Sequence, residues 1–243
     1  VSSLGDAIVI DLVTSFAFNV KARLGDSLPV RCLEGLNEID NVRPLLMVPV
    51  WVGGLLRRTC PDPNLHRQVQ EIWNGLVDRF LQIPFVRERL TKRGSLFRGE
   101  KLRLALKISK GMLRPESSRL LCWLGRKVGA RKKSFYPFAV QEKAFKNRRA
   151  RFIVYGHTHH YEMIPLDTDE SASGLENQIY LNSGTWRPVH ELARLRPGHE
   201  AFIGYNTMSY LTFFKNGERS GRLFESWSGS LAKSVSVNAS FTE

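Results

Sequence analysis

The chain has 243 residues, a formal net charge of +13 and 42% apolar residues, which is enough for a sizeable hydrophobic core. Its longest uncharged apolar run, Pro44 to Leu56, has 13 residues, too few for the roughly 20 that a membrane-spanning helix requires. We interpret this run as a buried helix or loop of the core. The three cysteines are widely spaced, so the sequence indicates neither a disulfide framework nor a thiolate zinc site. We expect a cytoplasmic protein, with a peripheral membrane contact left open.

The positive charge is concentrated in one stretch. Residues 87–151 contain 21 Lys and Arg against four Glu, a local net charge of +17, so the rest of the chain sums to −4. Such a stretch attracts polyanions such as nucleic acid, anionic lipid headgroups or phosphorylated substrates. It has few interleaved aromatic residues and no known binding motif, so we expect binding driven by phosphate contacts without sequence preference. A solvated helical face explains such a run equally well.

The first half of the chain has the periodicity of helices. Over residues 4–24 the apolar side chains recur at spacings of three and four, which predicts an amphipathic helix that begins near Asp6. A second helix is predicted from about Pro63 to Leu81. Basic helices are predicted around residues 100–112 and 116–128.

From about residue 150 the pattern changes to short strands between turn residues. Strands are predicted at residues 151–155, 161–166, 178–182, 201–205, 209–214 and 222–227. A polar loop is predicted from Asp167 to Asn177, and Asn216-Gly217 predicts a turn. The chain is therefore predicted to have two parts. Residues 1–148 form a mostly helical cap or insertion, which holds nearly all of the basic stretch 87–151, and residues 149–243 form a β-rich part.

Two histidines follow the first predicted strand directly, in the sequence Gly156-His157-Thr158-His159. Residues two apart in extended backbone point to the same side, so both imidazoles can face one site at the carboxyl end of the strand. This end is where α/β proteins commonly bind ligands. Imidazole is a common ligand of Zn, Mn and Fe, so His157 and His159 predict a metal site. Because the pattern is short, ordinary surface histidines remain the alternative.

A second strand ends nearby. Ile179-Tyr180-Leu181 runs into Asn-Ser-Gly-Thr-Trp, at a distance along the chain that lets two neighbouring strands end at the same edge of a sheet. Together, GHTHHYE and IYLNSGTW resemble the last sequence motif, and the strand after it, of the calcineurin-like metallophosphoesterases. The resemblance covers about residues 150–230. It implies an α/β fold, namely the C-terminal portion of a four-layer α/β/β/α sandwich preceded by a largely helical insertion.

The resemblance also implies a chemistry. In this family the first His of the motif binds one of two divalent ions (Mn, Zn or Fe) and the second His binds the other, which assigns His157 and His159 to different ions. The ion pair clamps a phosphate oxygen and activates a bridging water that attacks phosphorus. The implied function is hydrolysis of a phosphomonoester, a phosphodiester or a pyrophosphate.

The earlier motifs of the family are not found in the chain. Neither D-x-H, nor G-D-x-x-D, nor G-N-H followed by Asp or Glu occurs among the 243 residues. Two imidazoles are too few ligands for two ions and supply no bridging carboxylate. The chain opens on Val1 without a signal peptide. We therefore expect the other ligands upstream of Val1, and we expect the chain to be inactive by itself.

Three further residues lie near the predicted site in the sequence. His190 and Arg187, in a predicted loop rich in Arg and Pro, are candidates for contact with a substrate phosphate, and solvated loop residues are the alternative. His160 is expected to point away from the paired histidines. Two other functions stay open. One is a nucleic-acid or anionic-membrane binding module that uses the basic stretch, and the other is a degenerate, non-catalytic member of the family.

Overall fold

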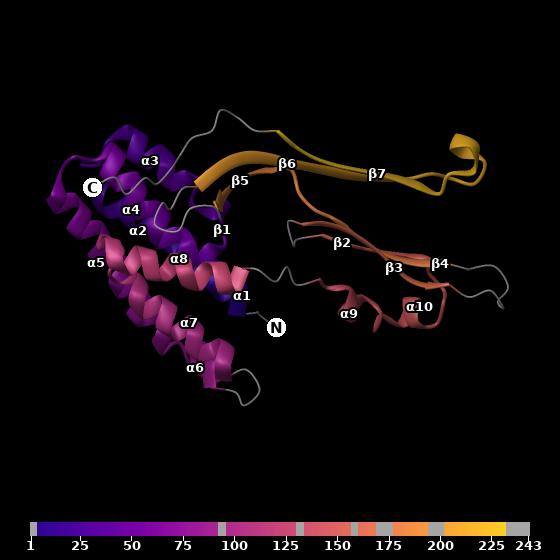
Figure 1. Cartoon of the computed structure of the whole chain (residues 1–243), viewed down its shortest axis with the longest axis horizontal. Coiled ribbons are helices and arrows are strands. Elements are labelled where there is room, and N and C mark those ends of the chain that lie inside the picture. Colours follow the sequence, from indigo (N-terminus) through magenta and orange to yellow (C-terminus); the bar gives the residue numbers. More distant parts are fainter. Residues whose placement is uncertain are drawn as a thin grey trace. The chain divides into compact units, whose positions relative to one another are not determined.

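The computed structural model has a mixed α/β architecture with two mixed sheets (Figure 1). It describes residues 4–91, 96–129, 134–156, 160–168, 177–193 and 202–231. The chain divides into two compact units. The first, called the helical unit, comprises residues 1–130, 189–204 and 235–243, and the second, called the β unit, comprises residues 131–188 and 205–234. These boundaries differ from the predicted parts 1–148 and 149–243. Within the described residues no helix is both long and apolar enough to cross a bilayer.

The helical unit begins with the predicted amphipathic helix, which the structure confirms. It consists of α1 (Leu4–Ala7), the π-helix η1 (Ile8–Thr14) and α2 (Ser15–Leu24). The π-helical middle is a feature that the periodicity did not predict. The next predicted helix is also confirmed, as α5 (Pro63–Gln82). Asp62 caps α5 because its carboxylate accepts a hydrogen bond from the Asn64 backbone N–H at 2.8 Å.

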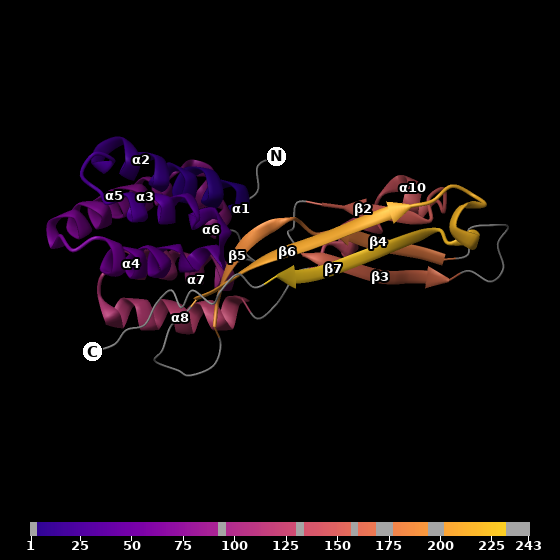
Figure 2. The same cartoon turned by 90° about the horizontal axis from the view of Figure 1, so that it is seen from above.

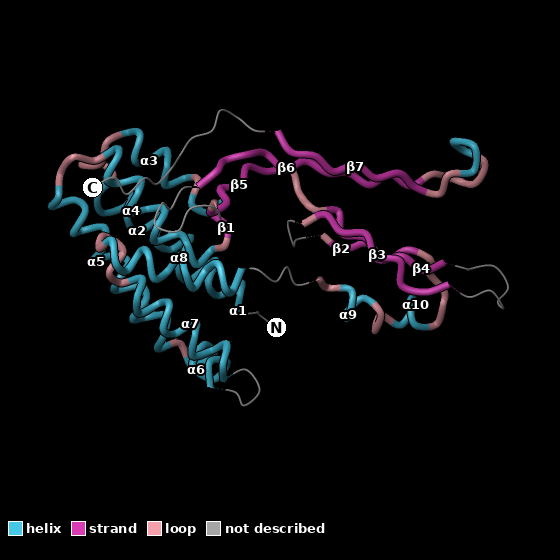
Figure 3. Tube along the Cα trace, in the orientation of Figure 1, coloured by secondary structure: helices cyan, strands magenta, loops and turns pink. Residues whose placement is uncertain are grey.

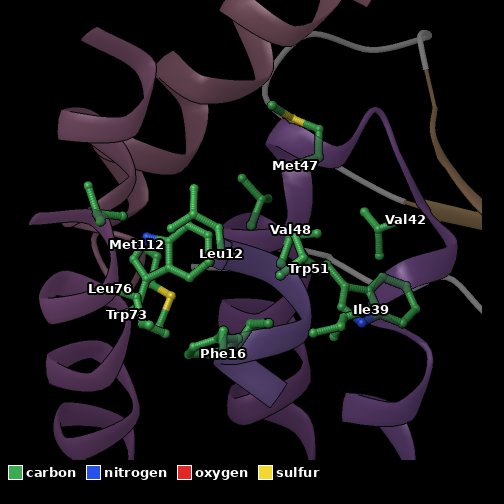
Figure 4. Close-up of a cluster of buried hydrophobic side chains, with 14 of the residues drawn as sticks. Leu12, Phe16, Ile39, Val42, Met47, Val48, Trp51, Trp73, Leu76 and Met112 are labelled. Atoms are coloured by element: carbon green, nitrogen blue, oxygen red, sulfur yellow. The ribbon is translucent and has the colours of Figure 1, made fainter. Parts of the chain in front are cut away.

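The remaining helices complete a single core. They are α3 (Val30–Asn37), η2 (Ile39–Asn41), η3 (Leu45–Met47), α4 (Val48–Thr59), α6 (Pro84–Thr91), α7 (Leu96–Ser109) and α8 (Pro115–Gly129). Helices α7 and α8 confirm the two predicted basic helices. The apolar run that we interpreted as buried contributes α4, in which residues 48–56 are all buried. Figure 4 shows Trp51 of α4, Phe16 of α2 and Trp73 of α5 among the core side chains.

Two layers of strands make up most of the β unit. One is a three-stranded sheet in the order β2 (Phe152–Tyr155), β4 (Asn177–Ser183) and β3 (Tyr161–Thr168). The other is the antiparallel pair of β6 (Phe202–Phe213) and β7 (Phe224–Leu231). The layers pack face to face (Figures 1 and 2), with the Phe152 ring centroid 5.3 Å from that of Phe213 and 5.2 Å from that of Phe224.

Short helices cover the other face of the three-stranded sheet. They are α9 (Tyr136–Ala139) and α10 (Lys143–Lys146), which Figure 3 shows beside β2, β3 and β4. Gln178 of β4 links the three-stranded sheet to the helices that cover it. Its Nε2 donates to the carbonyl oxygen of Phe145 in α10 at 2.7 Å and to that of Ala150 at 2.9 Å. The β unit is thus layered in the order helices, sheet, sheet.

The strand predictions have mixed outcomes. The structure confirms strands at β2, β3, β4 and β7, and the turn at Gly217, whose φ is +86°, lies between β6 and β7. Two predicted strands, at 201–205 and 209–214, are one continuous strand, β6, over the described residues. The predicted loop around residue 190 is wrong, since Arg187–Leu192 form strand β5.

The missed strand β5 pairs with a segment that is distant in the sequence. β5 runs parallel to the two-residue strand β1 (Val42–Arg43), with Val42 opposite His190, and the four-stranded sheet has the order β1-β5-β6-β7. A local pattern cannot reveal such a long-range pairing. Pro188 also weakens the strand pattern, because proline has no N–H for a ladder hydrogen bond.

Candidate metal centre

The candidate site lies where β2 and β4 end. These strands run parallel, with Phe152 opposite Ile179 and Tyr155 opposite Asn182. Their carboxyl ends therefore meet at one edge of the sheet, which confirms the expectation drawn from the two sequence motifs. Gly156 is exposed at this edge, and a Cβ atom added to it would lie 3.6 Å from the Ser183 Oγ.

The third strand begins at the same edge. β3 runs antiparallel to β4, with Tyr161 opposite Ser183 and Glu162 opposite Asn182. Gly156 and His160 thus flank the carboxyl end of β4 from its two sides, and His160 is exposed. The two proposed metal ligands, His157 and His159, lie outside the described residues.

The Asn-Ser-Gly turn after β4 is held by a closed set of hydrogen bonds. The Asn182 side chain is only 1% exposed, its Nδ2 donates to the Tyr180 hydroxyl at 3.1 Å, and its Oδ1 accepts from the Gly184 N–H at 3.2 Å. The Ser209 Oγ of β6 donates to the Ser183 carbonyl oxygen at 2.6 Å. Asn182 therefore positions the turn, and both of its side-chain polar atoms are engaged.

Gly184 is required by the geometry of this turn. Its φ is +64°, and an added Cβ atom would lie 2.5 Å from the Ser209 Oγ and 3.0 Å from the Tyr161 backbone nitrogen. Only glycine adopts such a backbone conformation at no steric cost and leaves room for so close an approach. Trp186, two residues further on, is 67% exposed, and its Nε1 donates to the Ser209 carbonyl oxygen.

Two carboxylates near this sheet accept hydrogen bonds from hydroxyl groups. Glu142 accepts a hydrogen bond from the Tyr155 hydroxyl at 3.2 Å, and Glu162 accepts one from the Ser134 Oγ at 2.8 Å. Burial, together with the Glu142 carboxylate, raises the pKa of the Tyr155 phenol. Over the part of the chain that the structure describes, no three His, Cys, Asp or Glu side chains lie together as a metal site.

Comparisons with family models, curated proteins and solved structures find no match for this chain. The assignment of a metal site therefore rests on the sequence motifs and on the edge that β2 and β4 share.

His190 packs inside the helical unit. Its imidazole stacks on the Trp51 indole with ring centroids 4.3 Å apart, and its Nε2 lies 3.4 Å from the Glu38 Oε2. Burial lowers the pKa of His190, and Glu38 opposes that shift. The Nδ1 atom of His190 is buried without a hydrogen-bond partner, and so is the Nε1 atom of Trp51.

The two candidates for phosphate contact belong to different units. Arg187 starts β5 in the β unit, where its carbonyl oxygen accepts a hydrogen bond from the Thr207 Oγ1 at 3.3 Å, whereas His190 lies in the helical unit. The contacts of His190 were not predictable from local patterns, because Glu38 and Trp51 lie about 140 or more residues away along the chain. The strand end at Gly156 remains the feature around which a site can be built.

Proposed function

We propose that this chain is the C-terminal part of a metal-dependent phosphoesterase in which His157 and His159 each bind one of two divalent ions. The observation that supports this most strongly is the shared edge of β2 and β4, where Gly156 lies beside Ser183. The hydrolysed bond is that of a phosphomonoester, a phosphodiester or a pyrophosphate. Arg187 is the described residue that we propose as a phosphate contact.

The layers of the β unit support the proposed sandwich. Helices α9 and α10, the β2-β4-β3 sheet and the β6-β7 pair follow the order of three layers of an α/β/β/α sandwich. On the outward face of β6 and β7, the rings of Tyr210 and Trp227 stack 6.2 Å apart and are 42% and 43% exposed. We propose that this face carries the fourth layer in the complete enzyme.

The donor set of the chain alone does not fit two metal ions. Two imidazoles provide one ligand for each ion and no bridging carboxylate, and the described residues add no three-ligand group. We propose that the remaining ligands come from outside these 243 residues.

Metal binding tests the assignment. Calorimetric titration of the chain with Zn²⁺ is expected to show weak binding, which His157→Ala and His159→Ala each reduce. His160→Ala is the matched control, because it is the adjacent histidine and is exposed. Equal losses in all three variants, or unchanged binding in the first two, would refute the roles of His157 and His159.

A second candidate function, binding of a polyanion, is favoured by a surface cleft in the basic stretch. Helices α5, α7 and α8 line a cleft of about 480 Å³ that contains Lys107, Lys110 and Arg114. Lys107 and Arg114 are exposed, whereas Lys110 forms an ion pair with Asp78 at 2.7 Å. Exposed cations in a cleft provide contacts for phosphate groups.

Salt dependence and charge reversal test this second function. We expect single-stranded DNA to bind with an affinity that falls steeply as salt rises and does not depend on sequence. The double variant Lys107→Glu/Arg114→Glu should weaken this binding more than Lys21→Glu/Arg23→Glu, which reverses two charges of α2 outside the stretch. Sequence-selective binding that resists salt would instead favour a dedicated nucleic-acid module.

A further inference from the structure

The helical unit contains an apolar cavity of about 90 Å³. Its walls come from the first helical segment, the η3–α4 junction, α5 and α7, and the lining side chains include Ile8, Leu12, Leu46, Trp73 and Leu106. Leu12 and Trp73 are labelled in Figure 4. The cavity belongs entirely to the helical unit and is independent of the proposed metal centre.

Two side-chain polar groups of the wall, those of Ser109 and Trp73, are hydrogen-bonded to each other. The Ser109 Oγ accepts a hydrogen bond from the Trp73 Nε1 at 2.9 Å and donates to the Leu106 carbonyl oxygen at 2.6 Å. Ser109 is fully buried, and Trp73 is 2% exposed. A ligand that needed a hydrogen bond would leave its own polar group unpaired in this wall. The wall therefore suits hydrocarbon.

The cavity is open along a rim of apolar side chains that are partly buried. Ile8, Leu45, Leu46 and Leu102 all line the cavity and are partly exposed. A chain that enters between them keeps its polar end in water. An apolar cavity of roughly 150 Å³ accepts a benzene ring, so this cavity of about 90 Å³ accepts a smaller apolar group of a few carbon atoms. Its size fits the narrow end of an unbranched alkyl chain.

One wall is built from an uncommon backbone. The π-helix η1 spans seven residues and supplies Ile8, Leu12 and Val13 to the cavity. π-helical turns are rare and occur frequently at functional sites. Side chains that line a void in a close-packed core have no partner atoms on one side, and an apolar group bound there supplies those contacts.

We propose that this cavity binds the end of an unbranched alkyl chain of an amphiphile, whose polar head stays in solvent at the rim. The protein recognises the alkyl chain of the amphiphile and not its polar head. An alkyl chain can belong to a free fatty acid or to a lipid ester, and both offer the same hydrocarbon end to the cavity.

A chain-length series tests the proposal. The 243-residue protein is titrated with alkanoates of four to ten carbons below their micelle concentrations, and binding is followed by the methyl resonances of Ile8 and Leu12. Affinity is expected to rise about fourfold with each methylene that enters the cavity or its rim, and then to level off. Octanol, with an uncharged head, should follow octanoate, and a short-chain phospholipid tests the lipid-ester source.

Two variants with opposite expected effects separate binding from misfolding. Ile8→Phe fills the entrance and should reduce octanoate affinity at least tenfold, whereas Leu106→Ala enlarges the cavity and should move the plateau to longer chains. Leu65→Phe is the matched control, because Leu65 is also partly buried against the core but does not line the cavity. Affinity that does not depend on chain length, or equal binding by wild-type protein and Ile8→Phe, would overturn the proposal.

Discussion

Replacing Gly184 with alanine is expected to destabilise the edge that carries the candidate metal centre. The positive φ of +64° costs an alanine roughly 1–2 kcal/mol. The new Cβ atom, 2.5 Å from the Ser209 Oγ, also displaces that hydroxyl from the Ser183 carbonyl oxygen and so removes a hydrogen bond with a net value of about 1 kcal/mol. The variant should therefore lose about 2–3 kcal/mol.

Gly217 provides the matched control. Its φ is +86°, and an alanine Cβ atom there would have no neighbour within 4 Å, so Gly217→Ala pays only the backbone cost of roughly 1–2 kcal/mol. Amide hydrogen exchange of β3 and β4 measures the difference locally, which matters because two compact units need not unfold together. We expect faster exchange around Tyr161 and Asn182 in Gly184→Ala alone. Equal exchange in the two variants would refute the crowding argument.

Three other outcomes follow from the structure. Because burial lowers the pKa of His190 below its ordinary value of 6.5, the unfolded chain binds a proton at a higher pH than the folded chain, and the free energy of unfolding should fall as the pH drops through 6.5. His190→Phe, which keeps a ring on Trp51, should reduce this fall in the free energy of unfolding, measured by urea titration above and below pH 6.5. An unchanged pH dependence would contradict the assignment of the fall to His190. Trp73→Phe removes the hydrogen bond to Ser109 and should lower the free energy of unfolding by about 1–2 kcal/mol in urea denaturation, whereas an unaltered midpoint would count against it. Excess Mn²⁺ should leave the hydrolysis of a generic phosphodiester by the 243-residue chain at background, and metal-dependent turnover abolished by His157→Ala would show that ligands within the chain were overlooked.

Local patterns predicted the elements whose partners are near in the sequence or whose periodicity is strong. The helix from Pro63 was predictable because its capping aspartate, its first-turn proline and its apolar spacing all agree. The π-helical turn at Ile8–Thr14 was not, because apolar residues at spacings of three and four fit α-helix as well. Strand β5 was missed because Pro188 weakens its strand pattern and because β1, one of its two neighbours in the sheet, lies about 150 residues away.

The candidate site also has features that local patterns predicted and features that they did not. Two apolar runs that end in polar motifs predicted that β2 and β4 share an edge, which the pairing of Tyr155 with Asn182 confirms. The role of Asn182 as a brace for the turn depends on Tyr180 and Gly184, and only the folded backbone shows those contacts. The stacking of His190 on Trp51 likewise depends on tertiary packing. This packing gives His190 a structural role in the helical unit, which is the alternative to the predicted phosphate contact.

The discontinuous make-up of the helical unit has a consequence for synthesis on the ribosome. Residues 189–204 belong to this unit, and Phe202 packs edge-on against Trp51 with ring centroids 5.4 Å apart. The 74 residues from Arg131 to Gly204 must be translated before that contact can form, which takes about 4–15 s at usual elongation rates. During this interval Trp51 of the nascent helices lacks its contact with Phe202. A chaperone can bind the helices in that time.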